Sequence, residues 1–283
     1  MLIAVVLSLS ACNTQQFAMR SRSPKIIGAF IPGLLKSNEG ILKVMPDDQR
    51  IILETGSFYV MYANAFVESP AKMIPPDKYE KREAEFEKAR QNYARGVEIL
   101  RTGLEKKYPG ISEAYMNGKS DEYIEKFTKD DVPLIYWLTA GTLCAFSMNP
   151  FDLSFGTKIA EVSLYIKKAY ELDPDWGDGM LDEFFLLYYA SLPVELGGDK
   201  TKAPLYYQRA LEKSKGLNAG LYVSWLECID IPEQNYEDFK EKVKLALAVN
   251  SNKAPDNRLI NTIAQRKAKY YLKNAVLFFA EAE

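Results

Sequence analysis

The sequence contains no histidine. Histidine is the commonest general base near neutral pH and the commonest ligand of transition metals in proteins. Its absence excludes catalytic sites of the Ser-His-Asp, Cys-His and HExxH types. We therefore expect no catalytic residues, no metal and no cofactor, and we predict that the protein is not an enzyme.

The chain also lacks an excess of charge of either sign. Its 36 Lys and Arg residues nearly balance its 38 Asp and Glu residues, giving a formal charge of -2, and no block of like charge stands out. A nucleic-acid-binding surface needs clustered basic residues that neutralise phosphates. Nucleic acid is therefore not an expected partner.

Long apolar runs are scarce, and the one at the N-terminus, Leu2 to Leu9, is too short to span a bilayer. Its length suits the core of a signal peptide, and Leu9-Ser10-Ala11-Cys12 resembles the bacterial lipobox, in which the cysteine thiol is acylated. We predict a signal peptide over residues 1–11, lipidation of Cys12 and a polar tether over 12–23. The protein would then lie in the periplasm, anchored to the inner or the outer membrane. The alternative is a short hydrophobic N-terminal helix, but the polar residues after Cys12 give such a helix no continuing apolar face.

Only two further cysteines are present, Cys144 and Cys228. In an exported protein they could form a disulfide. Cysteines in an apolar sequence context are also common as small buried hydrophobic residues. The sequence leaves both interpretations open and favours the second.

From Pro24 onward, nearly every segment has helical spacing of its apolar residues. Between Asp77 and Lys107, apolar or aromatic residues recur in steps of three and four, which is typical of an amphipathic helix. Pro75-Pro76 suits the start of this helix and Pro109-Gly110 its end. The segment from Gln49 to Val67 is its expected antiparallel partner.

Internal similarity in the second half indicates the fold. Trp137, Ala140, Gly141 and Cys144 have the spacing of the first helix of a tetratricopeptide repeat, with cysteine in place of an aromatic residue. The spacing of the second helix occurs three times, at Val162, Ile166, Ala169 and Pro174, at Ala203, Tyr207 and Ala210, and at Phe239, Val243 and Ala246. The central alanines Ala169, Ala210 and Ala246 are 41 and then 36 residues apart, so the repeats are irregular.

Two antiparallel helices cannot bury their apolar faces alone, so such pairs stack into one continuous core. We predict an all-α fold, with antiparallel helix pairs stacked as a degenerate tetratricopeptide-like solenoid preceded by N-terminal helical hairpins. A single domain would cover residues 24–283. Its helix pairs would lie at about 132–174, 177–215 and 217–251, and a capping helix would follow at 257–280.

Aromatic residues are the candidate partner- or ligand-binding positions, because a ring provides contact area and a tyrosine hydroxyl provides a hydrogen bond. Most single aromatic residues in such a fold serve helix packing, but some are expected to face a groove. The loop 147–156 is longer than a plain repeat turn and contributes two of the candidates, either as anchors for a partner or as a packed connector. The candidate positions are Tyr59, Tyr62, Trp137, Phe151, Phe155, Tyr188, Tyr189 and Tyr207.

Acidic pairs such as Asp130-Asp131 and Asp182-Glu183 could in principle form an acid/base dyad. They are expected instead at helix starts or on exposed faces, where a carboxylate interacts favourably with the helix dipole. A hydrolase using two carboxylates would require one of them to have a raised pKa in a cleft.

Taken together, long segments of the chain resemble the T component of TRAP transporters, also called TatT. The resemblance runs through the lipobox, YARGVEILRTGLEKKYPG, LIYWLTAGTLCAFSMNPFDLSFG, KKAYELDPDW, YYASLPVELGGDKTKAPLYYQRALEKSKG and NRLINTIAQRKAKYYL. It implies a periplasmic lipoprotein with degenerate tetratricopeptide-like repeats.

The resemblance also implies a function and partners. The protein would be a scaffold that binds the P component, the periplasmic substrate-binding protein of a TRAP transporter, and it would act as a homo-oligomer. It could also pass on an apolar or organic-acid ligand. The alternative is a general repeat lipoprotein that serves envelope protein assembly or lipid handling.

Overall fold

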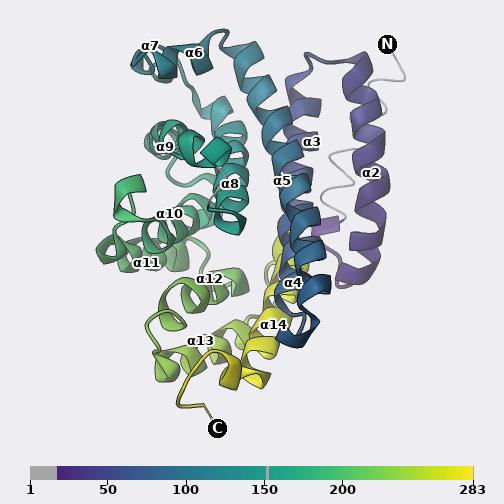
Figure 1. Cartoon of the computed structure of the whole chain (residues 1–283), viewed down its shortest axis with the longest axis vertical. Helices are drawn as coiled ribbons and strands as arrows, with labels where there is room; N and C mark the ends of the chain where they lie inside the picture. The colour runs from purple at the N-terminus through teal and green to yellow at the C-terminus, as the bar shows by residue number, and fades with distance from the viewer. Residues whose placement is uncertain (1–17, 151–152, 283) are drawn as a thin grey trace. The chain divides into compact units, whose positions relative to one another are not determined.

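The computed structural model describes residues 18–150 and 153–282 (Figure 1). Every regular element in these ranges is a helix, which confirms the all-α class. The chain folds into two compact units. The α3–α9 unit is Phe30–Trp176, and the α10–α14 unit is Gly177–Glu283 together with the chain up to Ala29. A single domain over residues 24–283 stays a prediction.

The first helix of the described chain, α2 (Pro24–Val44), is continuous, and the boundary between the units falls within it. Its buried residues follow helical spacing at Ile27, Ile31, Leu35 and Asn38. The residues just before α2 bind to the C-terminal part of the chain. Arg20 Nε lies 2.6 Å from Asp256 Oδ1, and Arg258 Nη1 donates a hydrogen bond of 3.0 Å to the carbonyl of Arg20.

Two long helical segments form the centre of the α3–α9 unit. The first is α3 (Gln49–Tyr62), which continues into the π-helix η1 (Ala63–Glu68) and α4 (Ser69–Lys72). Asp48 caps α3, since its carboxylate accepts hydrogen bonds from the backbone N–H groups of Arg50 and Ile51. The second is α5 (Tyr79–Lys107), preceded by the 3-10 turn η2 (Pro76–Lys78), close to the range that the sequence predicts.

Glycines allow these helices to approach closely. A Cβ built on Gly56 of α3 would lie 2.4 Å from Leu100, and one built on Gly103 of α5 would lie 2.4 Å from Ile52. Early residues of α3 therefore meet late residues of α5, so the pair is antiparallel, as expected from the sequence. Figure 1 shows these two helices side by side.

The rest of the α3–α9 unit contains a second packed helix pair, α8 and α9, preceded by three short elements. Its elements are α6 (Ile111–Met116), α7 (Asp121–Ile124), η3 (Lys129–Asp131), α8 (Val132–Met148) and α9 (Leu153–Leu172). Helix α8 packs on both α5 and α9. On α9, the repeat positions Val162, Ile166 and Ala169 are all buried. On α8, Trp137, Ala140 and Cys144 are only half-buried.

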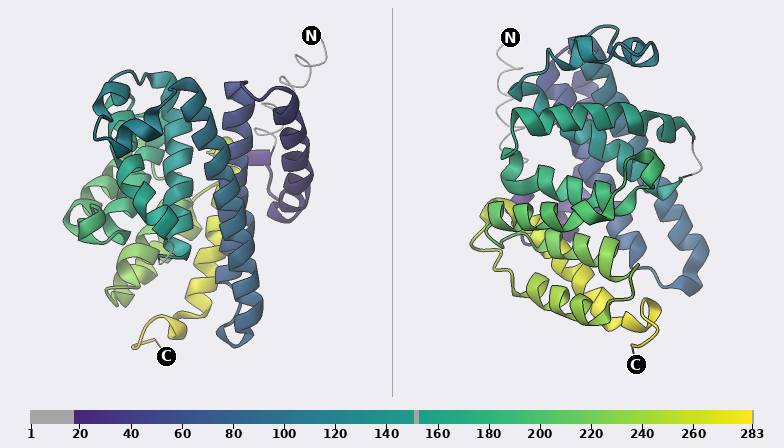
Figure 2. Two further views of the ribbon diagram at one scale, coloured as in Figure 1. Left: turned by 45° about the horizontal axis from the view of Figure 1, so that its top comes forward. Right: turned by 90° about the vertical axis from the view of Figure 1, so that its left-hand side faces the viewer.

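The α10–α14 unit consists of short helices that pack in succession, shown from two further sides in Figure 2. After the turn η4 (Trp176–Gly179) the elements are α10 (Met180–Ser191), η5 (Val194–Leu196), η6 (Lys200–Lys202), α11 (Ala203–Lys213), α12 (Ala219–Trp225), η7 (Leu226–Asp230), α13 (Tyr236–Ala248), η8 (Pro255–Asn257), α14 (Arg258–Lys273) and η9 (Ala275–Leu277). The repeat positions of α11 and α13 all belong to its core: Ala203, Tyr207, Ala210, Phe239, Val243 and Ala246.

Among the described residues, no helix combines the length and the apolar character that crossing a membrane requires. The predicted signal peptide and Cys12 lie outside the described residues.

Candidate functional site

The candidate aromatic residues of the α3–α9 unit take part in three separate sets of contacts. Tyr59 donates a hydrogen bond of 3.1 Å to Glu39, and burial together with this bond raises the pKa of its hydroxyl. Tyr62 stacks on Phe66 with ring centroids 6.0 Å apart. Trp137 and Tyr136 form a T-shaped contact with ring centroids 5.2 Å apart. Phe151 and the side chain of Phe155 lie outside the described residues.

In the α10–α14 unit, the neighbouring tyrosines Tyr188 and Tyr189 have different environments. Tyr188 is buried and donates a hydrogen bond of 3.0 Å to the carbonyl of Leu196, so it packs the η5 loop. Tyr189 is only half-buried and lies between two rings, with centroids 5.8 Å from Phe185 and 5.3 Å from Tyr206.

Two cations flank this set of rings, which we call the tyrosine stack (Phe185, Tyr189 and Tyr206). Lys202 Nζ lies 5.0 Å from the ring centroid of Tyr189, and the guanidinium of Arg209 lies 5.5 Å from that of Tyr206. Burial and the neighbouring Tyr206 raise the pKa of Tyr189 to about 12. The stack offers an apolar surface with positive charge at its edge.

Tyr207 belongs to a different cluster, in which aromatic rings pack beside two carboxyl groups. Its ring lies 4.6 Å from that of Trp225, and its hydroxyl pKa is raised by burial and by nearby acids. The indole Nε1 of Trp225 donates hydrogen bonds to both Asp230 Oδ1 (3.0 Å) and Asp238 Oδ2 (2.9 Å). We call Asp230 and Asp238 the acid pair.

The pKa values of the two members of the acid pair are shifted in opposite directions. Asp230 has no exposed surface; burial, and then hydrogen bonding to Asp238, raise its pKa to about 8. Burial acts in the same sense on Asp238, but hydrogen bonds from Lys242, Asp230 and Trp225 outweigh it and lower the pKa. Lys242 Nζ lies 2.5 Å from Asp238 Oδ1. These opposite shifts predict that the pair as a whole binds one proton near neutral pH.

Such a divided pair resembles the acid/base dyad that a carboxylate hydrolase would need. Asp230, the member with the raised pKa, is fully enclosed, so a substrate in solvent does not reach it. The acids singled out in the sequence are bound to neighbours at helix starts: Asp131 to Lys107 at 2.5 Å and Asp182 to Lys213 at 2.7 Å. Both are buried, although exposed faces were also expected for them.

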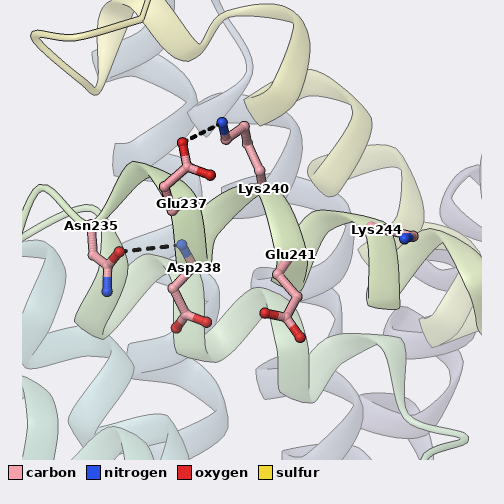
Figure 3. Close-up of a pocket in the computed structure, with 6 residues that line it drawn as sticks. All are labelled: Asn235, Glu237, Asp238, Lys240, Glu241 and Lys244. Carbon is pink, nitrogen blue, oxygen red and sulfur yellow. Dashed lines mark hydrogen bonds and ion pairs between the residues drawn. The ribbon is translucent and has the colours of Figure 1, made fainter.

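Beside the acid pair, the surface of α13 forms an open depression of about 580 Å³ (Figure 3). Its lining residues come only from α13 and its N-cap: Asn235, Glu237, Asp238, Lys240, Glu241 and Lys244. Figure 3 shows the carboxylates of Asp238 and Glu241 on the same side of α13. Because one helix provides the whole lining, the depression cannot enclose a small molecule, but it offers charged groups to a macromolecular partner.

Helices α10, α12 and α14 are connected by a polar network. Glu183 of α10 accepts hydrogen bonds from Ser224 Oγ (2.8 Å) and Asn218 Nδ2 (2.7 Å), and burial raises its pKa. Asn261 of α14 accepts from the N–H of Ala219 (2.8 Å) and donates to the carbonyl of Leu217 (2.9 Å).

A second part of this network lies at the start of η7. Glu227 accepts a short hydrogen bond from Tyr271 and lies 2.7 Å from Lys267 Nζ. Of this network and the acid pair, only Glu183 was singled out from the sequence, as part of an acidic pair expected at a helix start or on an exposed face. The one signal in the sequence is a set of acidic residues inside an apolar stretch, as in LECIDIP.

The remaining cysteines are present as thiols. Cys228 is buried, and burial followed by the charge of Glu227 raises the pKa of its thiol to about 12. Cys144 is half-buried. A thiol with a raised pKa is a poor nucleophile, so Cys228 behaves as a small apolar residue.

Comparison with known proteins places these features in a family. The chain is 26% identical over 259 residues to an uncharacterized protein of Treponema pallidum (strain Nichols), and the matched region covers 90% of this chain and 80% of that protein. Residues 21–279 match the family described as TRAP transporter T-component. That range contains the helices α2 to α14 and all the clusters described above, and the family is accessory to a transporter. The chain thus belongs to the TRAP transporter T-component family.

Proposed function

We propose that this protein is a periplasmic scaffold that binds the P component of a TRAP transporter. The observation that carries the proposal is the family match over residues 21–279, since an accessory component acts by association with the transporter system. The helix pairs of the α10–α14 unit support it, because stacked pairs present extended surfaces to protein partners.

The open depression on α13 is the contact surface that we assign to this partner. A surface that cannot enclose a small molecule still suits a protein, whose interfaces combine shallow contact with charged and polar rims. Glu237 and Lys240 form an ion pair at 2.6 Å, while Glu241 and Lys244 stand further along the helix (Figure 3). Both signs of charge are available for specific pairing.

Calorimetric titration of residues 13–283 with the P component of the same transporter tests this proposal. We expect measurable binding, and at least a tenfold weaker affinity when Lys240 and Lys244 are both changed to Glu, because the contact surface then loses its positive charges and becomes uniformly acidic. The matched control is Lys88→Glu on α5. Absence of binding by the unaltered chain at 100-fold excess would contradict the scaffold function, and equal affinity of the α13 variant would contradict the surface.

Transfer of an apolar or organic-acid ligand is a second part of the proposal, and the tyrosine stack supports it. Its rings offer apolar contact, and Lys202 and Arg209 lie at its edge. We expect aromatic carboxylates to change the tyrosine fluorescence of the unaltered chain and to have no effect after Tyr189→Ala. Unchanged titration of the variant would remove the stack from this role.

Anchoring by a lipidated Cys12 and assembly into a homo-oligomer complete the proposed function. Each buried CH₂ of an acyl chain contributes about 0.8 kcal/mol, so several chains hold a protein on a membrane permanently. Light scattering of the chain from Asn13 onward measures the oligomeric state, and a monomeric mass at high concentration would contradict assembly.

A further inference from the structure

Helix α2 carries an uncovered stripe opposite its buried face. With 3.6 residues per turn, every third or fourth position lies on one line along a helix. The line starting at Ile26 has the members Ile26, Phe30, Gly33, Ser37, Gly40 and Val44, which we call the α2 stripe. It is described on this one continuous helix alone.

The α2 stripe is apolar or small throughout, and it is exposed. Ile26 is 68% exposed, Phe30 56% and Val44 81%. A Cβ added at Gly33 or Gly40 would meet no atom within 4 Å, so no described residue covers the middle of the stripe. Two large apolar side chains one turn apart are thus held in solvent by a helix whose opposite face is buried.

Three lysines accompany the stripe along one flank. By helical spacing, Lys25, Lys36 and Lys43 lie on the same side of it, and all three are exposed. The helix has one acidic residue, Glu39, and Arg95 Nε lies 2.7 Å from it. No Asp or Glu precedes Glu39 in the sequence, so the exposed side of α2 is positively charged.

An apolar stripe beside a row of basic residues is the pattern of a helix that lies in the interface of an anionic bilayer. The chain geometry supports this occupant over a soluble one. Between Cys12 and Pro24 there are eleven residues, which span at most about 40 Å when extended. Lipidation of Cys12, as proposed above, would keep the start of α2 within that distance of the bilayer.

We propose that the α2 stripe and its three lysines rest on anionic phospholipids, so that α2 is a second membrane contact in addition to the lipid on Cys12. Phe30 and Ile26 enter the boundary between headgroups and acyl chains, and the lysines pair with phosphates. Each lysine is expected to strengthen binding about fivefold, and the three together about a hundredfold.

Co-sedimentation with vesicles tests the contact without the lipid on Cys12. Residues 13–283 contain the whole described structure and are mixed with vesicles of phosphatidylglycerol and phosphatidylethanolamine, or of phosphatidylcholine alone. We expect binding to the anionic vesicles, at least tenfold weaker after Ile26→Ser with Phe30→Ser, and about a hundredfold weaker after Lys25→Gln, Lys36→Gln and Lys43→Gln.

The control variants are Met116→Ser and Val194→Ser, which remove side chains 80% and 79% exposed elsewhere in the chain and should bind as the unaltered protein does. Far-ultraviolet circular dichroism and the thermal midpoint of each variant verify folding.

Equal binding of the stripe variant, or no binding of the unaltered chain to anionic vesicles, overturns the proposal. A dimer that the stripe variant abolishes, with no vesicle binding, overturns it in favour of a second copy. Because the test contains neither Cys12 nor the P component, its failure is distinct from failure of the proposed function.

Discussion

Individual buried acids are the residues that distinguish this chain from a plain helical repeat. Each unit contains a π-helix that ends on one of them, Glu68 in η1 and Asp230 in η7. Tyr93 donates a hydrogen bond of 2.5 Å to Glu68. Trp225 likewise donates a hydrogen bond to Asp230, with a length of 3.0 Å. The wider π turn redirects a side chain relative to an α-helix, and such turns are frequent at functional sites.

The raised pKa of Asp230 predicts that the stability of the fold depends on pH. Its pKa is about 8 when folded and near its ordinary value of 3.8 when unfolded, so between about pH 4 and 8 the folded state holds a proton that the unfolded state releases. Stability should fall as pH rises through this window, by at most about 1.4 kcal/mol per pH unit, and level off above pH 8. Asp230→Asn should remove this dependence and be the more stable protein at pH 8.

Urea unfolding at pH 5 and pH 8 measures the effect for the unaltered chain, for Asp230→Asn and for the exposed control Asp121→Asn. The slope belongs to the coupled acid pair as a whole. Identical pH dependence of Asp230→Asn and the unaltered chain would show that Asp230 is ionised in the folded state at neutral pH.

At the scale of elements, glycines set the distances between the helices of the α3–α9 unit. A Cβ built on Gly96 of α5 would lie 2.9 Å from the backbone oxygen of Gly56 in α3. A Cβ built on Gly141 of α8 would lie 2.7 Å from Val60. Because backbone cannot move aside as a flexible side chain does, the crossing of α3 and α5 tolerates no side chain at position 96.

We expect Gly96→Ala to lower the free energy of unfolding by about 1 to 2 kcal/mol, since overpacking outweighs the helix propensity gained. Gly40→Ala in α2 gains the same helix propensity, and its added Cβ meets no atom within 4 Å. This change should therefore raise the free energy of unfolding by about 0.5 to 1 kcal/mol. Denaturant unfolding of Gly96→Ala and of Gly40→Ala measures both changes in the free energy of unfolding. A stabilising Gly96→Ala would mean that α3 and α5 separate at little cost.

At the scale of the whole molecule, both membrane contacts that we propose lie in the N-terminal region. The described residues contain no helix able to cross a bilayer. The lipobox-like Cys12 and the α2 stripe with its three lysines follow each other in the sequence. The two proposed contacts differ in physical character, because an acyl anchor is insensitive to salt and a row of lysines is screened by it.

Cell fractionation after Cys12→Ser separates them. We expect the unaltered protein to stay with membranes through a wash in 1 M salt, and the variant to be released by that wash at least tenfold more completely. Cys144→Ser is the control and should behave as the unaltered protein. Retention of the Cys12 variant through the salt wash would place the anchor elsewhere.

Sequence periodicity determined the elements. Steps of three and four residues placed α5 close to its observed range, and the alanines Ala169, Ala210 and Ala246 are buried as the repeat spacing requires. The all-α class follows from the same local signals, because helix-forming patterns and glycine and proline punctuation act between near neighbours. The family came instead from the resemblance of long segments of the chain.

Only the tertiary structure decided which faces are covered and which charges are enclosed. Trp137 and Cys144 fit the repeat spacing but are half-buried, and Tyr188 is buried while its neighbour Tyr189 stacks at the surface. The acid pair joins Asp230 to Asp238 across a turn and beneath Trp225, so its single proton cannot be foreseen from spacing. Helical periodicity predicts which residues share a face, but the residues that cover that face come from elements distant in sequence. The α2 stripe is therefore recognisable only in the structure, where no described residue covers its glycines.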